Sequence, residues 1–152
     1  MRRLRCGLLA LALTVPAGWA APAAAAAPAT DVEALVNAAN EARARNGLPA
    51  LRLSPALTSS ALAYGKHLMR NGVFGHAGTL SAPGSFNRLG EALELHPGRA
   101  AHPRRTVRRW LASYSHRVLL LHRGFRYAGA AAVRGRFRGR TSTIWVLRLG
   151  GR

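Results

Sequence analysis

Few residues have side chains suited to covalent or acid–base chemistry. Ser113, Ser115 and His116 lie close together in the chain, and a hydroxyl with an imidazole is the pair that a serine hydrolase combines with an acid. Nearness in sequence does not establish the geometry of such a site, so a Ser-His-acid arrangement stays open. The sequence has no His-Glu-x-x-His, no phosphate-binding loop and no Gly-x-Ser-x-Gly, and its one cysteine is Cys6.

Arginine is the other side chain that can bind ligands, and it is concentrated in the second half of the chain. The 152 residues contain 23 Lys and Arg against 5 Asp and Glu, a formal net charge of +18. Residues 28–98 are nearly neutral, whereas residues 99–152 contain 14 arginines and no acid. Such a surface attracts polyanions. The predicted basic patch comprises Arg105, Arg108, Arg109, Arg134, Arg136, Arg138 and Arg140.

The N-terminal segment has the order of a secretory signal peptide. Three arginines within residues 1–5 precede an apolar stretch over 7–19, and small residues broken by prolines follow over 20–29. A retained membrane anchor is the alternative, because no charge occurs between Arg5 and Asp31. The prolines and the weak hydrophobicity of alanine favour the signal peptide. We expect residues 1–27 to be removed by a cut between 20 and 27, which leaves residues 28–152 as one secreted, monomeric domain without a transmembrane segment.

Export narrows the choice of polyanion. The expected partners are cell-envelope polymers or acidic lipid headgroups, and not nucleic acid. The alternative is that the coding bias of a GC-rich genome placed arginine at exposed positions, since the chain has 22 Arg and one Lys. Bias accounts for arginine in place of lysine, but it does not account for the absence of any acid after Glu94.

Local patterns predict the elements that must position these groups. Thr30-Asp31-Val32-Glu33 is a capping box that opens a first helix ending near Gly47, and Ser54-Pro55 opens a second helix that runs to Asn71-Gly72. Residues 48–53 form a short extended link between them. Thr106 is expected to cap a third helix in which Val107, Trp110, Leu111 and Tyr114 face inward, with Arg105, Arg108 and Arg109 on the opposite side.

Strands follow the helices. A short strand is expected over 89–95 within the long connection 73–103, and two further strands over 127–133 and 143–149 form a hairpin joined by residues 134–140. Helices followed by antiparallel strands predict an α+β layered domain. Trp110 and Trp145 are expected in its core, and His67, His96, His102 and His122 at surface or packing positions.

An ordered set of short motifs resembles the CAP superfamily, also called SCP-like. The resemblance covers about residues 32–149 and implies a three-layer α-β-α sandwich with a central antiparallel sheet, of the small exported bacterial type. The motifs are Leu35-Val36-Asn37, Asn46-Gly47-Leu48-Pro49-Ala50-Leu51, Phe74-Gly75-His76, Gly90-Glu91, Val107-Arg108-Arg109-Trp110-Leu111-Ala112-Ser113 and Ser115-His116-Arg117.

The resemblance also implies a cleft lined by His76, Glu91 and His116, with Ser113 at the place where relatives often have a second glutamate. Two imidazoles and a carboxylate can hold Zn²⁺ or another divalent metal with a position left for water. Two functions therefore remain. The first is non-catalytic binding of a lipid-like or cell-envelope ligand in this cleft, with polyanions held at the basic patch. The second is a divalent-metal-dependent hydrolase of an envelope or peptide substrate.

Overall fold

The computed structural model describes residues 30–82 and 84–152, so the predicted signal peptide over 1–27 lies outside the described residues. The described part forms four helices and a four-stranded sheet. In chain order the elements are α1 (Asp31–Arg45), β1 (Arg52–Leu53), α2 (Pro55–Asn71), β2 (Arg88–Pro97), α3 (Pro103–Ala112), α4 (Tyr114–Leu120), β3 (Tyr127–Phe137) and β4 (Arg140–Gly151).

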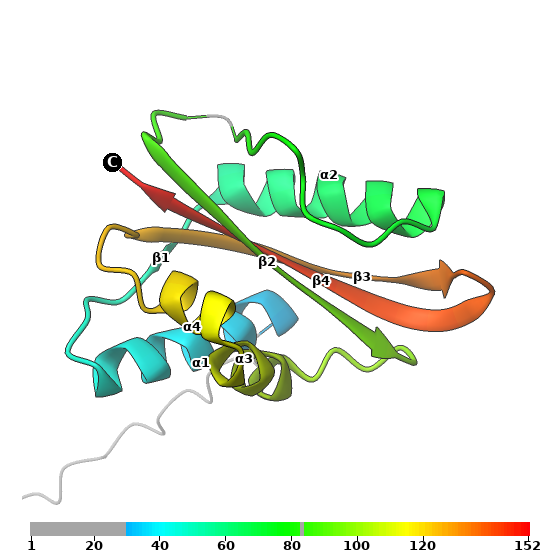
Figure 1. Cartoon of the computed structure of the whole chain (residues 1–152), viewed down its shortest axis with the longest axis horizontal. Helices are drawn as coiled ribbons and strands as arrows, with labels where there is room; N and C mark the ends of the chain where they lie inside the picture. The colour runs from blue at the N-terminus through cyan, green and yellow to red at the C-terminus, as the bar shows by residue number, and fades with distance from the viewer. Residues whose placement is uncertain (1–29, 83) are drawn as a thin grey trace, which may run out of the picture.

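The elements stack in three layers, as the resemblance implied. The helix α2 covers one face of the sheet, and α1, α3 and α4 cover the other (Figure 1). Each face has its own apolar cluster: Ala61 and Leu68 of α2 pack against Ile144 and Val146, whereas α1, α3 and α4 pack against Trp145 and its neighbours. The α+β sandwich is therefore confirmed.

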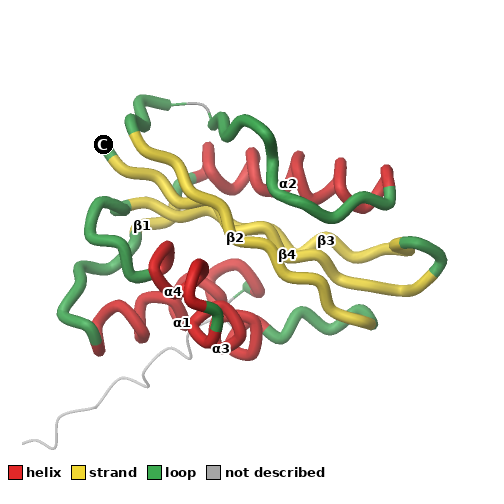
Figure 2. The backbone as a smooth tube through the Cα atoms, viewed as in Figure 1, coloured by secondary structure: helices red, strands yellow, loops and turns green. Residues whose placement is uncertain are grey.

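The strand order is β1-β3-β4-β2, and β1 runs parallel to β3 (Figure 2). The three long strands β3, β4 and β2 are antiparallel, as the resemblance implied, and the two-residue edge strand β1 makes the sheet mixed. The link from α1 to α2 passes the edge of the sheet as it crosses from one helical layer to the other. There Arg52 lies beside Tyr127 in the parallel register.

The central strand β4 is buried on both faces. Ile144 and Val146 face α2, while Trp145, Leu147 and Leu149 belong to the cluster on the opposite face. Trp145 and Trp110 are both 0% exposed, and their indole N–H groups donate to the carbonyls of Ala101 and Leu93. Both tryptophans are core residues, as predicted.

The first two helices begin where the sequence predicts. Thr30 and Glu33 form the capping box, and the Ser54 hydroxyl accepts from the Leu57 N–H. Gly72 ends α2 in the left-handed conformation, with φ at 62°. These signals act within one turn of backbone, so they need no tertiary context.

The prediction for the third helix is wrong in two respects. The cap position of α3 is His102, and Thr106 lies inside the helix, where its buried hydroxyl is 2.6 Å from Nε2 of His96. Tyr114 does not face inward: it begins α4 and is 75% exposed. The hairpin is also longer than expected, because β3 and β4 pair up to Phe137 and Arg140.

Candidate functional site

A groove lies between α2 and residues 75–81. Two side chains one helical turn apart tie the two segments together: the Ser60 hydroxyl donates to the Ser81 carbonyl at 2.8 Å, and the Tyr64 hydroxyl donates to the Gly75 carbonyl at 2.7 Å. The helix thereby fixes the position of the segment that carries His76.

The groove has a volume of about 840 Å³ and is lined mainly by hydroxyl and ring side chains. Among the described residues, the only lining residues with a purely aliphatic side chain are Ala63 and Ala77. Arg148 of β4 also lines the groove although it is only 4% exposed. The other lining residues are Ser59, Ser60, Tyr64, His67, His76, Gly78, Thr79 and Ser81.

A buried carboxylate organises one end of this groove. Oε1 of Glu91 lies 2.8 Å from Nδ1 of His76 and accepts from the Ala77 N–H at 3.1 Å. Oε2 forms an ion pair with Nη2 of Arg148 at 3.1 Å. Glu91 is 2% exposed at its side chain while His76 is 60% exposed, so a buried acid orients a solvent-facing imidazole.

Arg148 has unused hydrogen-bonding capacity. Its Nε and Nη1 atoms are buried without a hydrogen-bond partner among the described residues. Its guanidinium carbon lies 5.0 Å from the centre of the Tyr64 ring, a cation–π contact. Burial, together with the nearby Glu91 carboxylate, raises the pKa of Tyr64, so the hydroxyl remains a neutral donor to Gly75.

His116 reaches the same region from α4. Its ring centre lies 6.5 Å from that of His76 and 6.4 Å from that of Trp110. Burial lowers the pKa of His116, and the neighbouring His76 adds to the effect. The structure therefore brings His76, Glu91 and His116 together from three separate segments.

Sequence reasoning missed Arg148, Tyr64 and His67 as site residues. The sequence predicts no functional role for Tyr64 and places His67 at a surface or packing position. A usable signal existed for Arg148, because it is the one charged residue within the apolar run 144–149. A charge inside a strand buried on both faces must find a buried partner.

The match to a known family agrees with this arrangement. The sequence model described as CAP, the cysteine-rich secretory protein family, matches residues 36–149. The chain belongs to the CAP family. The CAP domain thus covers α1 through β4, from the first buried turn to the last paired strand.

Solved structures show the same fold. An outer surface protein from Borrelia burgdorferi is 25% identical, with a TM-score of 0.65 over 80% of this chain and 92% of that one. An extracellular protein with an SCP domain from Bacillus anthracis is 18% identical, with a TM-score of 0.63 over 84% and 45%. Venom allergen-like protein 4 from Schistosoma mansoni is 13% identical, with a TM-score of 0.59 over 82% and 91%. The comparison with curated proteins finds no match.

Glu91, the carboxylate of the predicted three-ligand metal set, already has neighbours of its own in the CAP domain. Both oxygens of Glu91 already contact His76, Ala77 or Arg148, which leaves only the imidazoles of His76 and His116. Over residues 30–82 and 84–152, no group of three or more His, Cys, Asp or Glu could hold a metal ion. Binding of Zn²⁺ or another divalent metal stays a prediction, and no chemical step is derived through it.

Ser113 of the CAP domain lies apart from the groove. Its hydroxyl is 3.3 Å from that of Ser115, and the residue joins α3 to α4. The groove lining includes neither Ser113 nor His116. The close spacing of these residues along the chain therefore reflects a helix junction, and no acid contacts His116 in the described structure.

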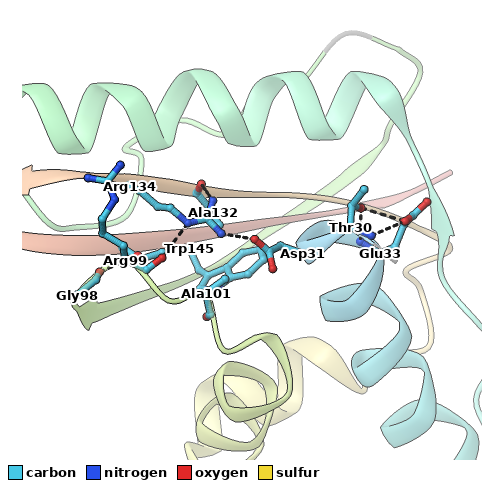
Figure 3. A network of polar contacts seen from close by, with 10 residues as sticks. Thr30, Asp31, Glu33, Gly98, Arg99, Ala101, Ala132, Arg134 and Trp145 are labelled. Atoms are coloured by element: carbon cyan, nitrogen blue, oxygen red, sulfur yellow. Dashed lines mark hydrogen bonds and ion pairs between the residues drawn. The ribbon is translucent and has the colours of Figure 1, made fainter. Parts of the chain in front are cut away.

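Three arginines of the predicted basic patch have contacts of their own within the domain. Arg134 reaches the Asp31 carboxylate at the start of α1 and donates to the Arg99 carbonyl at 2.9 Å (Figure 3). Arg138 instead turns toward α2 and donates to the Gly72 carbonyl. Arg109 is 2.8 Å from Glu94, so Arg109 and Arg134 are both neutralised. Attraction of polyanions by Arg105, Arg108, Arg136 and Arg140 stays a prediction.

Two further results concern the described part of the domain. His67 and His96 were both expected at surface or packing positions; His96 packs in the interior against Thr106, whereas His67 borders the groove. None of the helices in the described part is both long and apolar enough for a membrane span.

Proposed function

We propose that this chain is an exported, non-catalytic CAP-domain protein that binds a polar segment of a cell-envelope polymer in the groove between α2 and residues 75–81. The observation that carries the proposal is the groove itself, about 840 Å³ of open volume with hydroxyls and rings along both walls. Grooves with rings and convergent polar groups are common ligand sites.

The lining chemistry favours an envelope polymer over a lipid-like ligand. Ser59 and Ser60 on the helix face Thr79 and Ser81 on the loop, so a hydroxylated or amide-bearing ligand meets donors and acceptors on both sides. The Tyr64 and His67 rings are stacked, with centres 5.9 Å apart, and offer a flat surface to a sugar or peptide group. A lipid chain would need an aliphatic wall, which two alanines do not provide.

The buried Glu91–Arg148 pair supports ligand binding at one end of the groove. It holds His76 at the groove, and Nε and Nη1 of Arg148, a lining residue, have no hydrogen-bond partner among the described residues. A ligand oxygen at this end of the groove would meet an imidazole that is already oriented. Binding in one orientation is favoured, because little conformational entropy is lost in ordering the His76 side chain.

Binding of soluble cell-wall fragments tests the proposal. Glycan–peptide fragments released from bacterial peptidoglycan are titrated into the purified protein, and heat or amide shifts are recorded. His67→Ala is expected to weaken binding by roughly tenfold, because it removes one ring of the stacked pair. Lys66→Ala is the matched control on the same helix; its side chain is exposed outside the groove, and we expect a change below about twofold.

Three results would contradict the proposal. They are the absence of fragment binding, equal losses in the two variants, and fragment cleavage that disappears in His76→Ala. The last result would restore the hydrolase that the resemblance also allowed.

A further inference from the structure

Every strand of the sheet carries an arginine at the same end. Arg52 begins β1, Arg88 begins β2, Arg126 immediately precedes β3 and Arg152 immediately follows β4. The registers align these positions: Arg52 lies opposite Tyr127, Tyr127 opposite Gly150, and Arg88 opposite Gly151. Figure 1 shows the start of β2, the end of β4 and the turn before β3 at one end of the sheet.

This arrangement places the four arginines in a row along the strand ends, with Arg88 and Arg126 on one face of the sheet and Arg52 and Arg152 on the other. Neighbouring strands are about 4.8 Å apart, so the strand-end row of Arg52, Arg126, Arg152 and Arg88 spans about 14 Å. Neighbouring strand ends in the row therefore lie within the distance over which charges interact at physiological salt, about 8–10 Å. All four arginines are exposed. Arg123, also exposed, lies in the turn between α4 and β3 and adds a fifth charge.

No acidic side chain neutralises the strand-end row. The chain has five acids, and each has its contact elsewhere: Asp31 with Arg134, Glu33 with Thr30, Glu41 with Arg104, Glu91 with His76 and Arg148, and Glu94 with Arg109. Within the described structure, none of the arginines in the row forms an ion pair. The sandwich therefore leaves an uncompensated positive charge at this end.

Two hydrogen-bond donors face one another beside the row. The Gly124 N–H donates to Nδ1 of His122 at 2.9 Å, so the ring proton of neutral His122 is on Nε2. Nη1 of Arg88 lies 3.3 Å from that same Nε2. Both groups are hydrogen-bond donors, so they cannot bond to each other. An oxygen atom that lies between them would accept a hydrogen bond from each.

The row also has a rigid aromatic support. The guanidinium of Arg152 lies 4.9 Å from the centre of the Tyr127 ring and 5.8 Å from that of Phe86. The two rings pack edge to face, with centres 5.8 Å apart. Stacking holds this guanidinium at the end of the sheet while leaving its N–H groups free to bind an anion.

We infer that the strand-end row is a docking surface for the phosphate groups of an anionic lipid bilayer, with Arg88 and His122 sharing one phosphate oxygen. Guanidinium groups bind phosphate through paired, charge-assisted hydrogen bonds. A row across the end of a sheet suits a broad surface that presents many phosphates. The site is separate from the groove and does not depend on the proposed function.

Vesicle binding tests the inference. The purified protein is sedimented with phosphatidylcholine vesicles that contain or lack phosphatidylglycerol, at low and at physiological salt. We expect binding to the anionic vesicles only, with steep loss as salt increases. Arg88→Gln with Arg152→Gln is expected to lower the partition coefficient by about tenfold or more, because each arginine near the surface contributes roughly fivefold.

A charge-matched double variant separates site from net charge. Arg105→Gln with Arg140→Gln removes the same two charges from the predicted basic patch, and neither side chain forms a hydrogen bond in the described structure. We expect this control to change partitioning by less than about threefold. Equal losses in the two double variants, or no binding to anionic vesicles, would overturn the inference.

Two more measurements make the result specific. Binding of inorganic phosphate without any vesicle binding would also overturn the bilayer assignment. The groove variant His67→Ala should bind vesicles like the unmodified protein, so failure of the groove proposal and failure of this inference are distinguishable. Circular dichroism melts of each variant show whether the fold is retained.

Discussion

Nδ1 of His76 lies 2.8 Å from Oε1 of Glu91, and this contact couples the groove to a charge pair in the interior. Behind it, Glu91 meets Arg148, and both of these side chains are at least 96% buried. An exposed imidazole is thus oriented by a buried acid that is itself paired with a buried arginine. Stability and ligand binding should therefore respond together to changes at Arg148.

Arg148→Ala should lower the free energy of unfolding by about 3–5 kcal/mol, because it leaves the Glu91 carboxylate buried without its cation. Urea denaturation followed by circular dichroism measures the loss. Arg104→Ala is the control, since its pair with Glu41 is exposed and should contribute about 1 kcal/mol or less. The double change Glu91→Gln with Arg148→Met should recover much of the lost stability; no recovery would show that the charge pair is not the cause.

Acid should weaken the fold through His96. Burial is the main cause that lowers the pKa of His96, and Arg109, His102 and Arg105 add to it. The folded state therefore binds fewer protons than the unfolded state, whose histidine titrates near 6.5. The contribution of neutral His96 to the free energy of unfolding is therefore complete above the unfolded pKa. It is lost as the pH falls from the unfolded pKa toward the lower folded pKa.

The measurement is urea denaturation of the protein and of His96→Gln between pH 7.5 and 5.5. The slope of stability against pH should be smaller in the variant, by at most about 1.4 kcal/mol per pH unit. Part of the slope should remain, because burial also lowers the pKa of His116. If the slope of His96→Gln equals that of the unmodified protein, His96 is excluded as the source.

Gly129→Ala should strongly destabilise the sandwich. A methyl group at this position of β3 would overlap the backbone of Leu57 and Thr58 at the start of α2. Overpacking of this kind costs about 1–3 kcal/mol or more, because the helix must move away from the sheet. In Gly75→Ala the new methyl meets nothing within 4 Å, so thermal unfolding should stay within about 0.5 kcal/mol of the unmodified protein. Equal stability of both variants would contradict the close approach of α2 to β3.

The Asp31–Arg134 pair should contribute little to stability. Both side chains are partly exposed, at 44% and 33%, so water screens their attraction. A double-mutant cycle with Asp31→Asn and Arg134→Gln should give a coupling free energy of about 1 kcal/mol or less. A coupling several times larger would mean that Arg134 is essential for joining α1 to the hairpin.

Short-range chemistry in the sequence was sufficient for the first two helices. The Thr30 capping box, the Ser54-Pro55 start and the Gly72 stop each act within one turn, and all three are present as predicted. The resemblance to the CAP family then predicted the layered arrangement of the helices and the sheet. Thr106 shows the limit of such signals: a threonine before an apolar stripe predicts a cap, but burial against His96 gave its hydroxyl another partner.

Only the tertiary structure decided which charges remain free. By sequence, the basic patch was placed at the arginines of the third helix and the hairpin, yet Arg109 and Arg134 are paired with acids that lie 15 and 103 residues away. The strand-end row depends on four strands in one register, and that register is set by packing between the helical layers. Sequence determines local conformation and total charge, whereas the position of unpaired charge depends on contacts between distant segments.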